Sequence, residues 1–167
     1  EEILRELEKA QEEKWVEGKW TNGLLWAYDE PEMYPVLEGI PVFVPPPEQT
    51  WPPVAAKELR EGRWIERNWK RAGEMLEDKS KLTEFTKRIA DSEGLILDLA
   101  SGPGGGFVPR ILQLDPDAKI LMDDVGLPVL REWQRFLRDS DTPNVSFALF
   151  DARKMPLKPD SIDIVTD

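Results

Sequence analysis

From residue 54 onward, segments with apolar residues at helical spacing alternate with short, continuous apolar runs. The first such segment predicts a helix over residues 55–76, which Gly62 and Gly73 weaken and can split. Ser80 is placed to cap a second helix. The predicted apolar faces consist of Ile65, Trp69, Ala72 and Leu76 in the first helix and of Leu82, Phe85 and Ile89 in the second.

Four apolar runs further along are predicted to be strands, with a helix after each of the first two. The run Leu95-Ile96-Leu97 is continuous, as expected of a strand that is buried on both faces. Strands that alternate with helices at this spacing predict βαβ crossovers and a parallel sheet, and hence an α/β fold. The predicted strands are residues 95–97, 119–122, 145–150 and 161–166, and the helices between them are marked by Phe107, Ile111 and Leu114 and by Leu130, Trp133 and Leu137.

The first 53 residues differ in composition from the rest of the chain. Eight of the fifteen prolines lie between Pro31 and Pro53, and six of the seven tryptophans precede residue 70. We expect an amphipathic helix over residues 1–14, short strands over residues 20–28 and 36–44, and then a stiff proline-rich linker. The chain is therefore predicted to divide into an N-terminal appendage, residues 1–53, and an α/β domain, residues 54–167.

Composition excludes several kinds of chemistry. The 167 residues include neither His nor Cys, which excludes a Ser-His triad, a thiolate nucleophile, a disulfide and a zinc ribbon, and no metal site is predicted. A formal net charge of −11 repels phosphate backbones, so we expect no nucleic-acid partner. No apolar run approaches the ~20 residues that span a bilayer, and no signal peptide is visible, so we expect a cytoplasmic protein that does not bind membranes.

The candidate chemistry lies in the glycine-rich loop after the first strand of the α/β domain, Leu97 to Gly106, with the sequence LDLASGPGGG. Glycines there allow the backbone to approach a ligand closely, because no Cβ intervenes. A dinucleotide fingerprint that starts at Gly102 would need a glycine where Phe107 stands. A phosphate-binding P-loop would need Gly-Lys-Ser/Thr, whereas here Gly106 is followed by Phe107. Both phosphate-binding interpretations therefore fail.

An acid followed by small residues and a G-x-G resembles the first motif of class I S-adenosylmethionine-dependent methyltransferases. Here the acid is Asp98, and the two glycines are Gly102 and Gly104. That cofactor carries an ammonium group and a sulfonium but no phosphate. A carboxylate can accept from the ammonium, directly or through water, while the glycines leave room for the methionyl part. The resemblance implies a Rossmann-like, doubly wound, mostly parallel sheet and S-adenosylmethionine as the cofactor.

The resemblance continues at the ends of the next strands. In the family, an acid after the second strand accepts both ribose hydroxyls, and the next apolar residue packs on the adenine. The family's pattern D-x-x-x-x-x-L fits Asp124 to Leu130, which favours Asp124 as the ribose ligand, with Asp123 as the alternative. An acid after the third strand would accept from the adenine amino group. The cofactor-binding residues that the resemblance implies are Asp98, Ala100, Ser101, Gly102, Gly104, Asp123, Asp124, Val125, Asp151 and Ala152.

The resemblance covers residues 95–167, so we expect only the N-terminal half of the family's sheet. The family continues with three more strands and often places catalytic residues just after the fourth, so no catalytic residue is predicted here. An apolar fourth strand at an open sheet edge predicts self-association through that strand. We expect a methyltransferase that acts on a small-molecule acceptor. The alternative is a non-catalytic scaffold with a methyltransferase fold that binds a partner.

Overall fold

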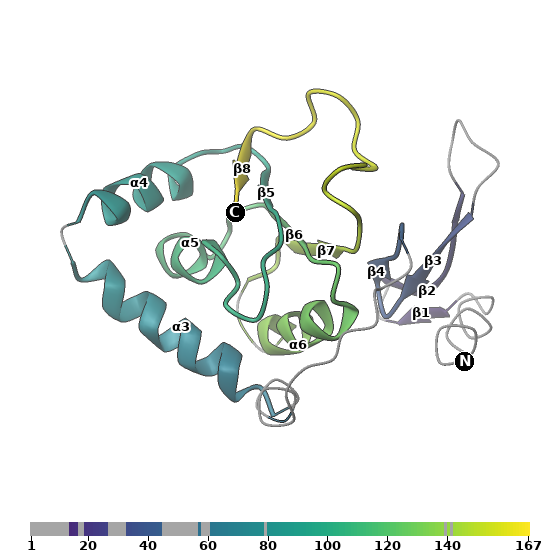
Figure 1. Cartoon of the computed structure of the whole chain (residues 1–167), viewed down its shortest axis with the longest axis horizontal. Coiled ribbons are helices and arrows are strands. Elements are labelled where there is room, and N and C mark those ends of the chain that lie inside the picture. The colour runs from purple at the N-terminus through teal and green to yellow at the C-terminus, as the bar shows by residue number, and fades with distance from the viewer. Residues whose placement is uncertain are drawn as a thin grey trace.

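The computed structural model describes residues 14–16, 19–26, 33–44, 57, 61–78, 80–138, 140 and 142–167. Within these residues the chain forms an antiparallel sheet and a parallel sheet, with helices packed against the latter (Figure 1). The antiparallel sheet consists of β1 (Lys14–Val16), β2 (Lys19–Trp26), β3 (Met33–Leu37) and β4 (Ile40–Pro41). The parallel sheet consists of β5 (Ile96–Asp98), β6 (Ile120–Asp123), β7 (Val145–Ala148) and β8 (Ile164–Thr166). The helices are α3 (Arg63–Leu76), α4 (Lys81–Ala90), α5 (Val108–Leu114) and α6 (Leu127–Arg138).

The parallel sheet has the strand order β7-β6-β5-β8, with Ile96 of β5 opposite Ile120 on one side and Ile164 on the other. If the four strands are numbered 1 to 4 along the chain, their order across the sheet is 3-2-1-4. A doubly wound sheet of the Rossmann kind contains the same order. The predicted fold class, an α/β protein with a partial Rossmann-like sheet, is therefore confirmed. Within the described residues, β8 pairs only with β5 and forms one edge of the sheet.

The helices cover one face of the parallel sheet, and residues 151–163 pass over the other (Figure 1). Apolar residues at every second strand position face the helices, as a pleated strand requires. On the opposite face, Leu157 and Ile162 pack against a cluster of Leu97, Ala148 and Phe150. The core under the helices includes Ile96, Ile120 and Met122 from the strands and Ile65, Ile89, Ile111, Leu130 and Trp133 from the helices.

The ends of the first two helices follow from local backbone chemistry. Gly62 precedes α3 with a φ of 69°, so the helix begins one residue later than this left-handed position. Gly73, by contrast, lies inside α3 without breaking it. Ser80 caps α4 as predicted, because its Oγ accepts from the backbone N–H of Thr83 at 3.3 Å. The predicted helix over residues 1–14, apart from Lys14 in β1, and the proline-rich linker lie outside the described residues.

The prediction of one strand over residues 36–44 is wrong, because a tight turn divides this segment. Glu38 and Gly39 both have positive φ, 52° and 83°, which is the combination that a two-residue type I′ hairpin turn needs. The turn brings Leu37 of β3 opposite Ile40 of β4. Apolar residues on both sides of the turn made the segment resemble one continuous strand.

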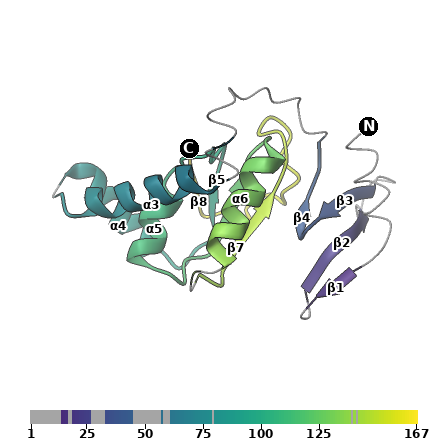
Figure 2. The same cartoon turned by 90° about the horizontal axis from the view of Figure 1, so that it is seen from below.

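The hairpin β3–β4 is joined to the parallel sheet beside β7 (Figure 2). The backbone N–H of Leu149 donates to the carbonyl of Pro41 at 2.9 Å, and the N–H of Phe43 donates to the carbonyl of Leu149 at 2.8 Å. The side chains of Ile40 and Val42 are buried in the same core as the residues under the helices. Residues 40–43 thus extend the sheet and share its hydrophobic core.

Within the described part of the chain, none of the helices combines the length and the apolar character that crossing a bilayer requires.

We predict that Ile40→Ala lowers the free energy of unfolding of the parallel sheet by about 2–5 kcal/mol, because a buried side chain shared by hairpin and sheet leaves a cavity in both. Urea denaturation followed by circular dichroism measures this loss. Val165→Ala is the control: Val165 is 57% exposed, so the change should be about 0.5 kcal/mol or less. If Ile40→Ala left the main unfolding transition unchanged, the hairpin would not belong to the same cooperative unit.

Candidate functional site

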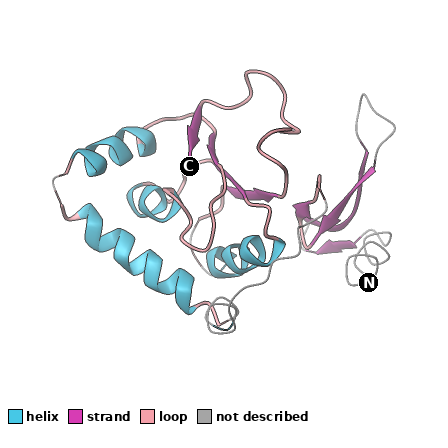
Figure 3. Cartoon of the chain, in the orientation of Figure 1, coloured by secondary structure: helices cyan, strands magenta, loops and turns pink. Residues whose placement is uncertain are grey.

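The predicted acids and the glycine-rich loop meet at the carboxyl ends of the parallel strands. Asp98 ends β5, Asp123 ends β6, and Asp151 follows β7 by three residues. The loop from β5 to α5 crosses toward β6 (Figure 3), where the N–H of Ser101 donates to the carbonyl of Asp123 at 2.9 Å. Open parallel sheets bind ligands at this edge. The structure therefore gathers the predicted residues where such a sheet would use them.

Asp98 holds the loop together from within. Its carboxylate is 0% exposed and accepts from the hydroxyls of Ser101 and Thr166, each at 2.6 Å, and from the N–H of Phe107 at 3.4 Å. Burial raises the pKa of this carboxyl, while the three donors oppose the rise and the charge of Asp167 adds to it. The structure thus ties Asp98 to the loop, to the end of β8 and to the residue before α5.

The glycines of the loop have different tasks. Gly105 has a φ of 71°, and a Cβ there would overlap the indole ring of Trp133. A Cβ at Gly106 would lie 2.6 Å from a carboxylate oxygen of Asp98. Gly104 is exposed, and nothing lies within 4 Å of the place where its Cβ would be. Gly105 and Gly106 therefore serve the loop's own packing, whereas Gly104 presents backbone to open space.

Asp124 connects the loop to the start of α6. One carboxylate oxygen accepts from the N–H of Gly102 at 2.8 Å, and the other accepts from the N–H of Gly126 at 2.6 Å. The carboxylate is buried, but the side chain of the next residue, Val125, is 41% exposed. Both oxygens of Asp124 thus have backbone partners in this chain, and the apolar residue predicted to contact the adenine is exposed beside it.

Asp123 lies deeper and faces the end of β7. Its carboxylate accepts from the N–H of Phe150 at 3.0 Å and from the N–H of Ala100. Burial, and to a smaller extent the charges of Asp124 and Asp151, raise the pKa of this carboxyl to about 7 against the two backbone donors. Asp123 therefore binds the ends of three neighbouring segments while carrying a proton through part of the neutral range.

Asp151 is held at the surface by Arg153. The guanidinium donates to both carboxylate oxygens, the shortest contact being 2.6 Å from Nη2, and the N–H of Arg153 adds a fourth bond at 2.8 Å. These bonds lower the pKa of Asp151 to about 2. Ala152, between the two, is exposed. The predicted adenine-binding acid thus already has a cationic partner in this chain.

Three residues of this site are not among those that the sequence pattern predicts: Thr166, Arg153 and Trp133. Trp133 was identified only as part of an apolar helix face, and its Nε1–H donates to the carbonyl of Gly102 at 2.9 Å. Spacing shows which face of a helix is buried, but it does not show which polar atom at the edge of that face finds a partner.

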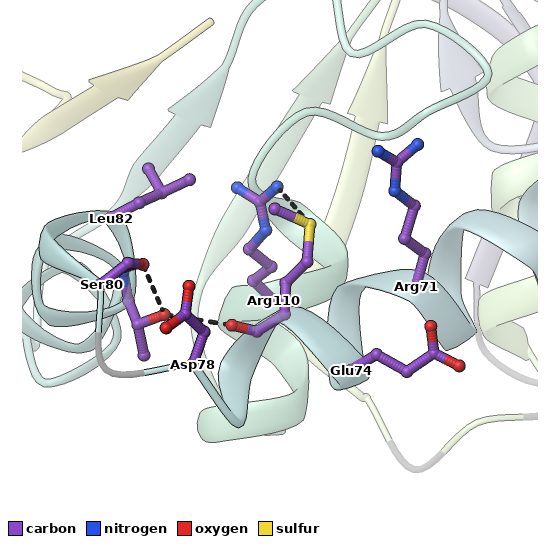
Figure 4. A pocket seen from close by; sticks show the side chains of 8 residues that line it. Arg71, Glu74, Asp78, Ser80, Leu82 and Arg110 are labelled. Atoms are coloured by element: carbon purple, nitrogen blue, oxygen red, sulfur yellow. Dashed lines mark hydrogen bonds between the residues drawn. The ribbon is translucent and has the colours of Figure 1, made fainter.

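A pocket of about 320 Å³ lies elsewhere, between α3, α4 and the first turn of α5 (Figure 4). Arg110 donates to the sulfur of Met75 at 3.3 Å along one wall. None of the predicted site residues lines this pocket, so it is separate from the strand ends. Its lining consists of Arg71, Glu74, Met75, Asp78, Ser80, Leu82, Thr83 and Arg110.

We predict that the free energy of unfolding falls as the pH rises from 3.8, the ordinary pKa of Asp123, to about 7, its value in the folded chain. In this window the folded chain keeps a proton that the unfolded chain has lost, so acid favours the folded state. Asp123→Asn should flatten the slope, by at most about 1.4 kcal/mol per pH unit. Asp98, whose pKa is also raised, should retain part of the dependence.

Urea unfolding at several pH values across this window measures the slope. Asp160→Asn is the control, because that acid is exposed at the surface and its φ of 57° suits asparagine. A slope in Asp123→Asn equal to that of the wild-type chain would show that this carboxyl does not hold the proton.

The sequence matches no protein-family model and no curated protein. Solved structures similar to this chain include the PH0226 protein from Pyrococcus horikoshii, the YcgJ protein from Bacillus subtilis and a SAM-dependent methyltransferase from Aquifex aeolicus. They are 25%, 22% and 18% identical, with TM-scores of 0.42, 0.41 and 0.42. The matches cover 50%, 49% and 58% of this chain.

The same matches cover 38%, 35% and 54% of those structures, so this chain spans well under two thirds of each. The parallel order β7-β6-β5-β8, with the glycine-rich loop after β5, is the partial Rossmann-like sheet that the sequence predicted.

Proposed function

We propose that this chain forms the cofactor-binding part of an S-adenosylmethionine-dependent methyltransferase that acts on a small-molecule acceptor. The observation that carries the proposal is the open backbone at Gly104, in a loop whose Gly102 is held by Asp124, the residue before the exposed Val125. A ligand that lies directly against the backbone needs the space that a Cβ would otherwise fill. The absence of a Gly-Lys-Ser/Thr sequence in this loop favours a ligand without a phosphate.

Each residue has a separate task in this proposal. Gly104, with Ala100, Ser101 and Gly102, would hold the methionyl part against the backbone of the loop. Asp124 would accept from the ribose hydroxyls, with Val125 packing on the adenine. Asp151 and Ala152 would contact the adenine edge. Asp98 and Asp123 support these residues from beneath, because their carboxylates accept from the loop and from Phe150.

The bound cofactor would supply an activated methyl group on a sulfonium. The chain's own contribution is then to bind, orient and exclude water, because an in-line displacement depends mainly on alignment and desolvation. A general base is not a requirement of such a transfer. The proposal therefore assigns no catalytic residue within this chain.

A non-catalytic scaffold is the second candidate, and the Arg153–Asp151 contact favours it. A guanidinium that occupies both oxygens of Asp151 competes with an adenine amino group for the same acceptor. A chain that binds a partner and no cofactor can keep this contact permanently. Measurement of cofactor binding separates the two candidates.

We predict that Gly104→Val abolishes binding of S-adenosylhomocysteine without changing the fold. No atom lies within 4 Å of the added Cβ, so the folded chain has room for the side chain, while a ligand against the loop would meet it. Isothermal titration calorimetry measures the affinity, and urea unfolding checks the stability. Equal affinity in the variant and in the wild-type chain would contradict the placement of the ligand at Gly104. No binding by the wild-type chain would favour the scaffold.

We predict that Asp124→Asn weakens this binding far more than Asp123→Asn does. The two acids are adjacent and both are buried, so they form a matched pair. Loss of a charged acceptor for a ribose hydroxyl should cost about 1.5–3 kcal/mol. Asp123→Asn likewise replaces one of two oxygens near backbone donors, here Phe150 and Ala100, but it removes no proposed ligand contact and should weaken binding much less. The reverse ranking, in the same calorimetric titration, would assign the ribose to Asp123.

A further inference from the structure

One buried side chain of α6, that of Trp133, contacts the glycine-rich loop at two points. The side chain is 0% exposed, and its Nε1–H donates to the carbonyl of Gly102 at 2.9 Å. Its six-membered ring lies against Gly105, where a Cβ would overlap Cζ2 and would lie 2.9 Å from Cε2. Phe136 supports the indole from the side, with ring centroids 5.9 Å apart at 87°. The loop therefore rests on a rigid aromatic surface.

The carbonyl of Gly102 is the centre of this contact. It accepts from Trp133 and also from the N–H of Gly105 at 3.2 Å, which closes the turn of the loop. The N–H of the same glycine donates to Asp124 at 2.8 Å. Both polar groups of Gly102 are thus bound by side chains at or near α6, and Gly104 lies inside the turn that they define.

We propose that Trp133 is a positioning residue that holds the turn Gly102–Gly105, and with it the open backbone at Gly104, in the conformation that binds ligand. The binding part of this inference rests on the function proposed above. The holding part does not, because it concerns the free chain. A merely apolar core residue would need the volume of the indole but not its N–H.

Trp133→Phe tests this distinction, because it keeps an aromatic ring and removes the donor. We expect faster hydrogen exchange at the amides of Gly102 and residues 104–107 in the free chain, with the amides of β5 and β6 unchanged. Affinity for S-adenosylhomocysteine should fall about five- to tenfold, as the loss of one hydrogen bond implies. Trp69→Phe is the matched control: Trp69 packs on the same Phe136, and neither measurement should change.

A double-mutant cycle with Gly105→Ala tests the ring contact. In the wild-type chain the new methyl group meets Trp133 and also takes a φ of 71°, so exchange at Gly102 and residues 104–107 should rise and stability should fall. The strain from φ is common to both backgrounds, so only the non-additive part of the cycle reports the ring contact. In Trp133→Phe, which lacks Cζ2, the same substitution should cost less, so the two changes should be non-additive. If Trp133→Phe did not fold, the indole N–H of Trp133 in the wild-type chain would decide: it should exchange as slowly as the amide of Gly105, and fast exchange would overturn the positioning role.

The outcomes separate the two proposals. Unchanged exchange at the loop in Trp133→Phe, or faster exchange with unchanged affinity, would overturn the positioning role. A wild-type chain that does not bind S-adenosylhomocysteine would overturn the proposed function. In that case hydrogen exchange and the mutant cycle, which need no ligand, still decide whether Trp133 holds the turn.

Discussion

The buried carboxylate of Asp98 is the contact on which the rest of the site depends. A carboxylate that is removed from water must have its oxygens satisfied, or it destabilises the fold by far more than a neutral polar group does. Here the donors come from Ser101, Phe107 and Thr166, which belong to the loop, the start of α5 and β8. One acid therefore fixes how three segments meet at the end of β5, and the close approach of Gly106 to the same carboxylate follows from this geometry.

The neighbouring acids extend the same principle to the next strands. Asp123 takes backbone donors from Phe150 and Ala100, and Asp124 takes them from Gly102 and Gly126. Backbone N–H groups just after a strand or just before a helix have no partner within that element. Buried carboxylates supply the acceptors that these groups need. The concentration of acids also has a cost, because the nearby charges help to raise the pKa of Asp123 to about 7.

The sequence predicted the order of strands and helices along the chain, because each element shows in local periodicity and in the polar residues where a strand ends. It did not predict the turn at Glu38 and Gly39, since apolar residues continue on both sides of it. Nor did it predict the bond between Thr166 and Asp98, which are 68 positions apart in the chain. Hydrophobic patterns assign faces to elements, whereas hydrogen bonds between distant elements depend on where the completed sheet places them.

The four acids differ in how readily a ligand could engage them. The contacts of Asp98 and Asp123 are buried, so giving them up would leave unsatisfied groups inside the protein. Asp151 shares its charge with Arg153 at the surface, where an ion pair contributes little and its partners exchange readily with water. A ligand can therefore replace Arg153 as the partner of Asp151 without disturbing the sheet. It cannot bind Asp98 without breaking the hydrogen bonds that hold the glycine-rich loop in place. Asp98, the acid that begins the motif, acts on the shape of the loop. Asp124 is also buried and accepts from Gly102 and Gly126, so under the proposed function a ribose hydroxyl would share its oxygens with these backbone donors.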